Sequence, residues 1–298
     1  VFDDLFFGDY GVLNGIGTIL SFVPIIFFLY FALSILEDSG YMARAAFVMD
    51  RLMRKLGLTG RAIISMILGF GCNVPGVYST RAIPDEGDRL IAIVINPLIP
   101  CSARLVVFAC LAYVFFGPLA GNVIFSMYVL GIGLAVLIAI IMRKSYLKGR
   151  VSPFILELPP YQAPTLRTVI LHAYERGILF FKKAGTVIFG GLLVLEILMH
   201  LQWPLGWGPV ETSVICALGK ALQPLFSPMG WDWRLVVAVV FGFVAKEIVL
   251  GATAALYGVP EEGLGARLGE LYTPVQAFSY MVFVLAYVPC VATVAAIA

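Results

Sequence analysis

Charged side chains are scarce in this sequence: Asp, Glu, Lys and Arg make up 13% of its 298 residues, whereas hydrophobic residues make up 61%. A soluble domain of this length cannot bury so much apolar surface, so the composition indicates an integral membrane protein. Charge is absent from three long runs, residues 10–36, 105–142 and 275–298. About 20 apolar residues cross the hydrocarbon core, and a barrel would show short alternating segments instead. The sequence therefore predicts an all-α, multi-pass membrane protein.

Other absences exclude whole classes of function. Only two histidines occur, His172 and His200, and the H-E-x-x-H and G-x-S-x-G motifs are missing, so we do not expect an enzyme. The basic residues lie beside apolar runs, without interleaved aromatics, so nucleic-acid binding has no support. Five cysteines in an embedded chain do not indicate a disulfide framework. Because the sequence opens at Val1, we expect a piece of a longer protein.

The distribution of charge predicts two segments that do not simply cross. Lys and Arg favour the cytoplasmic side, which places residues 37–61 and 143–183 inside, and the acidic loop 259–274 is expected outside. Three apolar pieces separate the two inside segments, and three full crossings would end on the wrong side. One piece must therefore enter and return, and residues 62–80 are the best candidate. Residues 235–258 begin outside and are followed by the outside loop 259–274, so this segment is also expected to enter and return, from the opposite face.

The chain divides into two halves around a basic, proline-rich linker. We expect a first repeat over residues 1–150, a cytoplasmic linker with an amphipathic helix over 151–183, and a second repeat over 184–298. Residues 40–56 and 166–185 have the pattern of helices that lie at the membrane interface.

The stretch GFGCNVPG, residues 69–76, is built to interrupt a helix at membrane depth. Unwound backbone is tolerated there only where protein or a watery cavity receives its polar groups, and freed carbonyls are ready cation ligands. Gly69–Thr80 aligns without a gap with Gly242–Thr253, and Pro100–Ala103 aligns with Pro289–Ala292. With the opposite orientation of the halves, this order predicts two inverted repeats with broken or re-entrant helices.

At three of these sites a cysteine lies within a few residues of a proline. Thiolates suit transition metals and do not suit Na⁺ or Mg²⁺, and neighbouring amide and hydroxyl groups add oxygen ligands. The alternative is that these cysteines are small apolar packing residues, as we expect for Cys110 and Cys216. The candidate metal ligands at these helix interruptions are Cys72, Cys101, Cys290, Asn73, Asn96 and Ser102.

Intramembrane charge adds one more candidate ligand. Glu247 is expected to bind a cation or to transfer protons, with its neighbour Lys246 held by another acid or by carbonyls; the alternative is an ordinary helix end at an interface. Glu196 and His200 fit a polar contact near the outer interface. Arg104 is expected to be structural.

Several of these motifs together resemble one known family. LSILEDSGYMARAAFVMDRLMRKLGLTGRA, GFGCNVPG, PLIPCSARL, FKKAGTVI, AKEIV and YVPCVAT occur in the order found in the membrane core of the ferrous iron transport protein B family. The resemblance runs from about residue 11 to 298 and implies Fe²⁺ uptake across a bacterial cell inner membrane through two Gate-type repeats. The alternative is a Gate-fold transporter of an organic solute such as a nucleoside.

The resemblance also implies partners, and the sequence differs from the family at several points. The family's gating cysteines correspond to Cys72, Cys101 and Cys290. Its GTPase domain, which would bind GTP and Mg²⁺, and its first membrane helix have no counterpart in this sequence, so we expect no cofactor of the chain's own, with Fe²⁺ as substrate. Expected partners are membrane lipid, that GTPase domain and small cytoplasmic accessory proteins; a homo-oligomer is compatible with the sequence. Gly76 and Val106 stand where the family often has Ala and Pro.

Overall fold

The computed structural model describes residues 12–55, 58, 60–145, 163–180, 213–246 and 248–297, with scattered positions between 181 and 212. Nearly all of these residues are helical; an antiparallel pair, β1 (Leu201–Gln202) with β2 (Gly206–Trp207), is the exception. Residues 151–162 of the predicted linker, Glu196 and His200 lie outside the described residues, as does most of the predicted span 184–203.

By contacts the chain forms two compact units, each taken by itself here. Unit 1 contains residues 1–21, 103–127 and 184–292, and unit 2 contains residues 22–102, 128–183 and 293–298. The division of the sequence at residues 150 and 183 stays a prediction.

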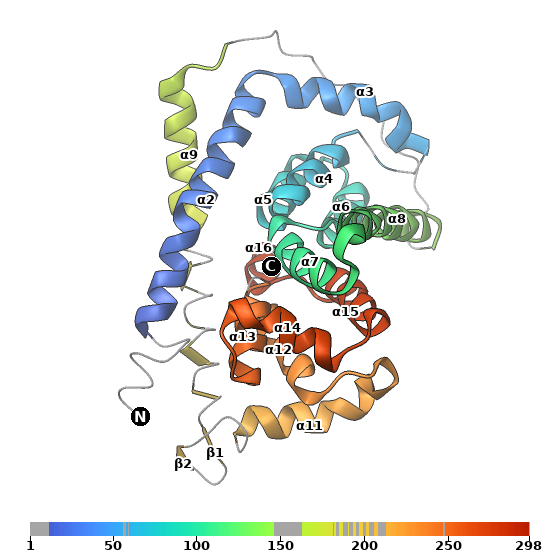
Figure 1. Ribbon diagram of the computed structural model, residues 1–298. Helices are drawn as coiled ribbons and strands as arrows, with labels where there is room; N and C mark the ends of the chain where they lie inside the picture. Colours follow the sequence, from blue (N-terminus) through green and yellow to red (C-terminus); the bar gives the residue numbers. More distant parts are fainter. Residues whose placement is uncertain are drawn as a thin grey trace. The chain divides into compact units, whose positions relative to one another are not determined.

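Unit 2 is built on a broken helix packed between neighbours. An apolar core joins α3, α4, α6 and α8 and includes Ala46, Met66, Ile91 and Ala139. Its elements (Figure 1) are α2 (Val12–Asp38, from residue 22 on), α3 (Tyr41–Lys55), α4 (Ala62–Gly71), α5 (Asn73–Ser79), η1 (Thr80–Ala82), α6 (Glu86–Ile95), η2 (Asn96–Leu98), α8 (Ala120–Ser145, from residue 128 on) and α9 (Leu166–Phe180).

Unit 1 is likewise helical, and its core joins α11, α12 and α13 through Ile215, Phe241 and Ala252. Beside them, Trp231 stacks on Phe226 with ring centroids 5.4 Å apart. Its elements are the starts of α2 and α8 (to residues 21 and 127), α7 (Ser102–Phe116), η3 (Gly117–Leu119), β1, β2, α11 (Val214–Phe226), η6 (Ser227–Met229), α12 (Trp233–Val244), α13 (Ile248–Tyr257), α14 (Glu261–Leu271), α15 (Pro274–Ala286) and the start of α16 (Val291–Ile297).

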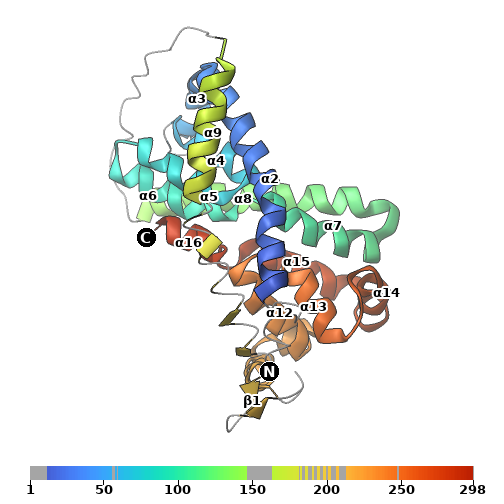
Figure 2. The same cartoon turned by 90° about the vertical axis from the view of Figure 1, so that its left-hand side faces the viewer.

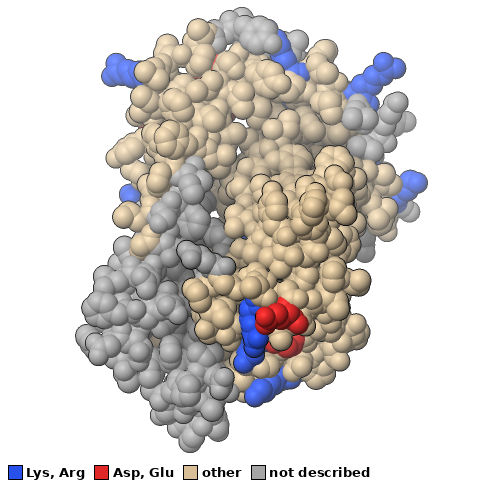
Figure 3. Space-filling view, in the orientation of Figure 1, with Lys and Arg blue, Asp and Glu red and all other residues tan. Residues whose placement is uncertain are grey.

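Length and hydropathy make two of the described helical stretches able to cross a membrane, Glu86–Ser145 and Pro274–Ile297. Shorter apolar helices flank the predicted breaks: Ala62–Gly71, Trp233–Val244 and Ile248–Tyr257. The face seen in Figure 3 is mostly uncharged. These features agree with the all-α membrane class predicted from composition.

One expectation was wrong: residues 261–271, predicted as part of an acidic loop, form the helix α14. Leu264 and Leu268 are buried on one face of it, four residues apart. Gly265 and Gly269 let the helix approach Val114 of α7, because a β-carbon added at Gly265 would lie 2.8 Å from Val114 Cγ2. Close packing of this face therefore outweighs the weak helix propensity of the glycines.

Helix α9 lies alongside the second part of α2 (Figures 1 and 2). Arg176 donates to Glu37 Oε2 at 2.5 Å, and His172 Nδ1 lies 3.5 Å from Asp38 Oδ2. The hydrogen bond with Glu37 raises the pKa of Arg176. The acidic pair that ends α2 is thus engaged by α9.

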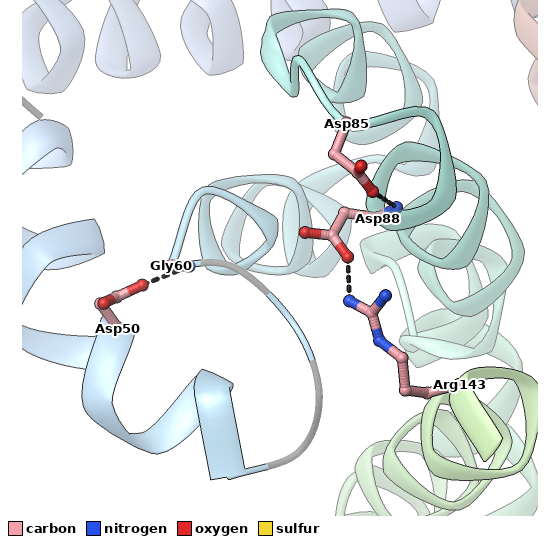
Figure 4. Close-up of polar contacts among 5 residues, drawn as sticks. All are labelled: Asp50, Gly60, Asp85, Asp88 and Arg143. Carbon is pink, nitrogen blue, oxygen red and sulfur yellow. Dashed lines mark hydrogen bonds and ion pairs between the residues drawn. The ribbon is translucent and has the colours of Figure 1, made fainter. Parts of the chain in front are cut away.

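A buried ion pair ties α6 to α8 (Figure 4). The Asp88 side chain has no exposed surface and accepts from Arg143. Asp85 caps the same helix by accepting from the Asp88 backbone N–H at 2.8 Å. On the neighbouring turn between α3 and α4, Asp50 Oδ1 accepts from the Gly60 N–H at 2.9 Å.

We expect Arg143→Met to destabilise the protein by about 3–5 kcal/mol, because it leaves the buried Asp88 carboxylate without its guanidinium. The double variant Asp88→Leu/Arg143→Met should recover most of that loss. Unfolding of the purified protein in detergent, compared across wild type, both single variants and the double variant, measures the coupling. Additive losses in the double variant would contradict a stabilising pair.

Candidate functional site

The first break interrupts the helix of unit 2 at a single residue. Cys72 has extended backbone angles, φ −152° and ψ 132°, between α4 and α5. Its N–H still donates to Leu68 O at 2.9 Å, which completes α4, and its carbonyl accepts from Gly76 N at 3.3 Å, which starts α5. Pro75 lies in the first turn of α5, where a proline is tolerated. The break therefore redirects the chain while leaving few backbone groups unpaired.

Asn96 forms the centre of a buried polar cluster behind this break. Its Nδ2 donates to Ser65 O at 2.7 Å and to Ser65 Oγ at 3.0 Å. Ser65 Oγ in turn donates to the Gly76 carbonyl at 2.8 Å. A β-carbon added at Gly76 would lie 2.4 Å from Asn96 Nδ2, and one added at Gly69 would lie 3.1 Å from it. The glycines of GFGCNVPG therefore make room for Asn96 as well as interrupting the helix.

Two amide oxygens in this cluster have no hydrogen-bond partner. Asn73 is 5% exposed and Asn96 is fully buried, and Oδ1 of each is unpartnered. A β-carbon at Gly69 would also lie 3.6 Å from Asn73 Oδ1, so both amides border that glycine. Because a buried unpaired oxygen costs free energy, such atoms are candidate ligands for a cation.

The second cysteine-bearing segment of unit 2 is hydrogen-bonded to the first. Ser102 Oγ donates to the Gly71 carbonyl at 2.9 Å, next to Cys72, and Cys101 immediately precedes Ser102. Both cysteines are half-buried. The structure thus brings together two of the three cysteine-bearing breaks, although Gly71 and Ser102 are 31 positions apart in sequence.

Unit 1 contains a second break of the same form. Ala245, between α12 and α13, has φ −149° and ψ 131°, and its N–H donates to Phe241 O at 3.3 Å. Lys246 follows and is 2% exposed. Glu247, the predicted ligand beside it, lies outside the described residues.

The segment before Cys290 is also unwound, between α15 and α16. Lys246 Nζ donates to Val288 O at 2.7 Å and lies 3.1 Å from the centre of the Tyr287 ring. Arg104 is fully buried and donates from Nη2 to Tyr287 O at 3.5 Å. The expectation that Lys246 is held by carbonyls is therefore met in unit 1, and Arg104 binds a helix end instead of extending to an interface.

Sequence reasoning missed Ser65 and Tyr287 as members of these clusters. Ser65 is the one hydroxyl in the apolar run Ala62–Gly71, and that isolation was a usable signal. Among the described residues, no three His, Cys, Asp or Glu side chains form a group able to hold a metal ion. The five cysteines, all described, form no disulfide.

Comparison with known sequences finds two matching families. The Gate family, described as "Nucleoside recognition", matches residues 19–115 and 181–298, and the family described as "Ferrous iron transport protein B C terminus" matches residues 124–176. No solved structure matches the chain.

Several curated relatives match along the chain. The Fe(2+) transporter FeoB of Methanocaldococcus jannaschii is 48% identical over 96% of this chain and 44% of its own length. That of Staphylococcus aureus strain COL is 42% identical over 96% of the chain and 43% of its own length. A Porphyromonas gingivalis protein, "Fe(2+) transport protein A/Fe(2+) transporter FeoB fusion protein", is 38% identical over 96% of the chain and 40% of its own length. The chain thus spans less than half the length of these relatives, and it belongs to the ferrous iron transport protein B family, as part of the C-terminal transmembrane region.

Proposed function

We propose that this chain is the membrane part of a ferrous iron transporter and that Fe²⁺ crosses the bilayer along its broken helices. The observation behind the proposal is the half-buried thiol of Cys72 at the single extended residue of a membrane helix. Membership of the family and the printed names of the relatives support Fe²⁺ as the substrate. An organic solute is less supported, since it rests only on the printed description of the Gate family.

The proposed ligands come from each break in turn. In unit 2, Cys72 and Cys101 would supply soft thiolates, and Asn73, Asn96 and Ser102 would supply oxygens. Asn96 is the best oriented of the oxygens, because its amide nitrogen is fixed on Ser65 while Oδ1 is unpartnered. In unit 1 the proposed ligands are Cys290 and Glu247. Hydrated Fe²⁺ would exchange water for these groups as it moves inward.

We further propose that the two breaks belong to inverted repeats. Cys72 and Ala245 occupy aligned positions, and their backbone angles agree within a few degrees. Thr80 and Thr253, also aligned, both donate their hydroxyls to a backbone carbonyl of the preceding turn. Such repeats place unwound segments at a substrate path in many transporters.

The proposed setting is the bacterial cell inner membrane, which the chain would cross several times. The Porphyromonas fusion protein supports a partner of the Fe(2+) transport protein A type. A GTPase domain of the same protein is a further proposed partner, and the chain is proposed to have no cofactor of its own and no catalytic activity.

Cysteine variants test the substrate and path together. In cells that produce the complete protein at matched membrane levels, Cys72→Ser, Cys101→Ser and Cys290→Ser should each lower anaerobic Fe²⁺ uptake by about tenfold or more, since each removes a soft ligand. Cys110→Ser is the matched control: this thiol is also half-buried but lies within α7, away from the breaks. Normal uptake by all three variants would exclude the cysteines from the path.

Asn73→Leu tests the oxygen ligands. If Asn73 Oδ1 binds the metal, uptake should fall about tenfold while stability holds or rises, because an unpaired buried oxygen is removed. The exposed Asn122→Leu on α8 controls for loss of an amide. Uptake and thermal unfolding are measured on the same preparations. Unchanged uptake with raised stability would show that Asn73 is a packing residue.

A further inference from the structure

The two aligned breaks differ in the residue that follows the extended position. Asn73 follows Cys72, and Lys246 follows Ala245. Both side chains are buried, at 5% and 2% exposure. At the first break this position holds an amide whose oxygen is unpartnered, and at the second break it holds a primary amine that donates to a carbonyl. One break therefore offers a cation ligand at the point where the other holds a cation.

The surroundings of Lys246 are those of a bound cation. Its Nζ lies 2.7 Å from the Val288 carbonyl oxygen and 3.1 Å from the centre of the Tyr287 ring, and both groups attract positive charge. Val288 belongs to the unwound segment that ends at Cys290, where carbonyls are released from helical pairing. The neighbouring carbonyl, Tyr287 O, receives Arg104 Nη2 at 3.5 Å. Two successive carbonyls beside Cys290 are thus each bound by a side-chain cation of the protein.

We propose that Lys246 is a tethered cation that fills a metal-binding position of the second break and that the transported metal must displace it. The inference rests on the proposed function and adds a residue that controls occupancy of the path. A divalent ion and the lysine ammonium cannot share these ligands, because like charges at contact distance repel strongly. Binding of the metal is then weakened by the fraction of time that the lysine occupies the position.

Capping of a helix C-terminus is the alternative role, since Lys and Arg near the last carbonyls stabilise a helix. The two roles differ in what they predict. A cap affects stability and leaves the metal's apparent affinity unchanged, whereas a tethered competitor raises the KM for the metal.

The test is Fe²⁺ uptake by the complete protein in proteoliposomes under anaerobic conditions. Lys246→Asn, which copies the first break, and Lys246→Met, which keeps the length of the side chain, should lower the KM for Fe²⁺ by about tenfold. Lys246→Arg should keep the KM of the wild type. Lys220→Met is the matched control, because Lys220 is an exposed lysine of unit 1 whose Nζ lies 5.9 Å from the Trp233 ring centre.

A second measurement uses the wild-type protein and needs no substitution. A membrane-permeant amine reagent should modify Lys246 faster when Fe²⁺ is present, since the metal releases the side chain from Val288 O, and modification of Lys220 should not change. Mass spectrometry of the peptides reports both sites.

The outcomes separate this inference from the function on which it rests. An unchanged KM in Lys246→Met, or labelling of Lys246 that does not respond to Fe²⁺, overturns the tethered cation while wild-type uptake upholds the transporter. Absence of Fe²⁺ uptake by the wild type overturns both.

Discussion

The fold depends on how a membrane helix can be interrupted without leaving backbone groups unpaired in a medium that supplies no water. At the first break the interruption is confined to one extended residue, Cys72. Cys72 and Ala245 each close the preceding helix with an N–H to the carbonyl four residues earlier; α5 begins at Asn73, directly after Cys72, and α13 begins at Ile248. Because the backbone is so nearly satisfied, it is the side chains that follow the break that determine its chemistry.

Those side chains make the two breaks unequal. Behind Cys72, the cluster of Ser65 and Asn96 fixes one end of an amide and leaves its oxygen unpartnered. Beyond Ala245, Lys246 and Arg104 bind successive carbonyls at the end of α15. Similar backbone geometry therefore supports an oxygen-rich environment in unit 2 and a cation-bound one in unit 1. The proposed repeats would thus differ at one position, where an uncharged amide follows the first extended residue and an ammonium group follows the second.

The positions of the helix breaks could largely be predicted from the sequence. Glycine and proline at membrane depth located the breaks at Cys72 and Cys290, because few other requirements explain such residues there. The count of crossings and the charge at Lys246 located the remaining break. Partners of the buried polar groups were not predictable: Asn96 meets Ser65 across 31 positions, and Lys246 meets Val288 across 42. Helix α14 was missed because residues 259–274 were assigned to an outside loop on their acidic charge, and charge says nothing of the close approach of Gly265 to Val114.

The buried charges of unit 2 are also paired with each other. Asp88 on α6 is fully buried and paired with Arg143 on α8, and both helices contribute to the core that encloses α4. Asn96 directly follows α6, so the ion pair fixes the helix that presents the amide to Gly69 and Gly76. A buried pair of this kind contributes little net stability compared with apolar packing, and its value lies in specifying one arrangement. In the proposed path, where ligand positions would decide which ion binds, a unique register of α6 against α4 would hold the amide oxygens in place.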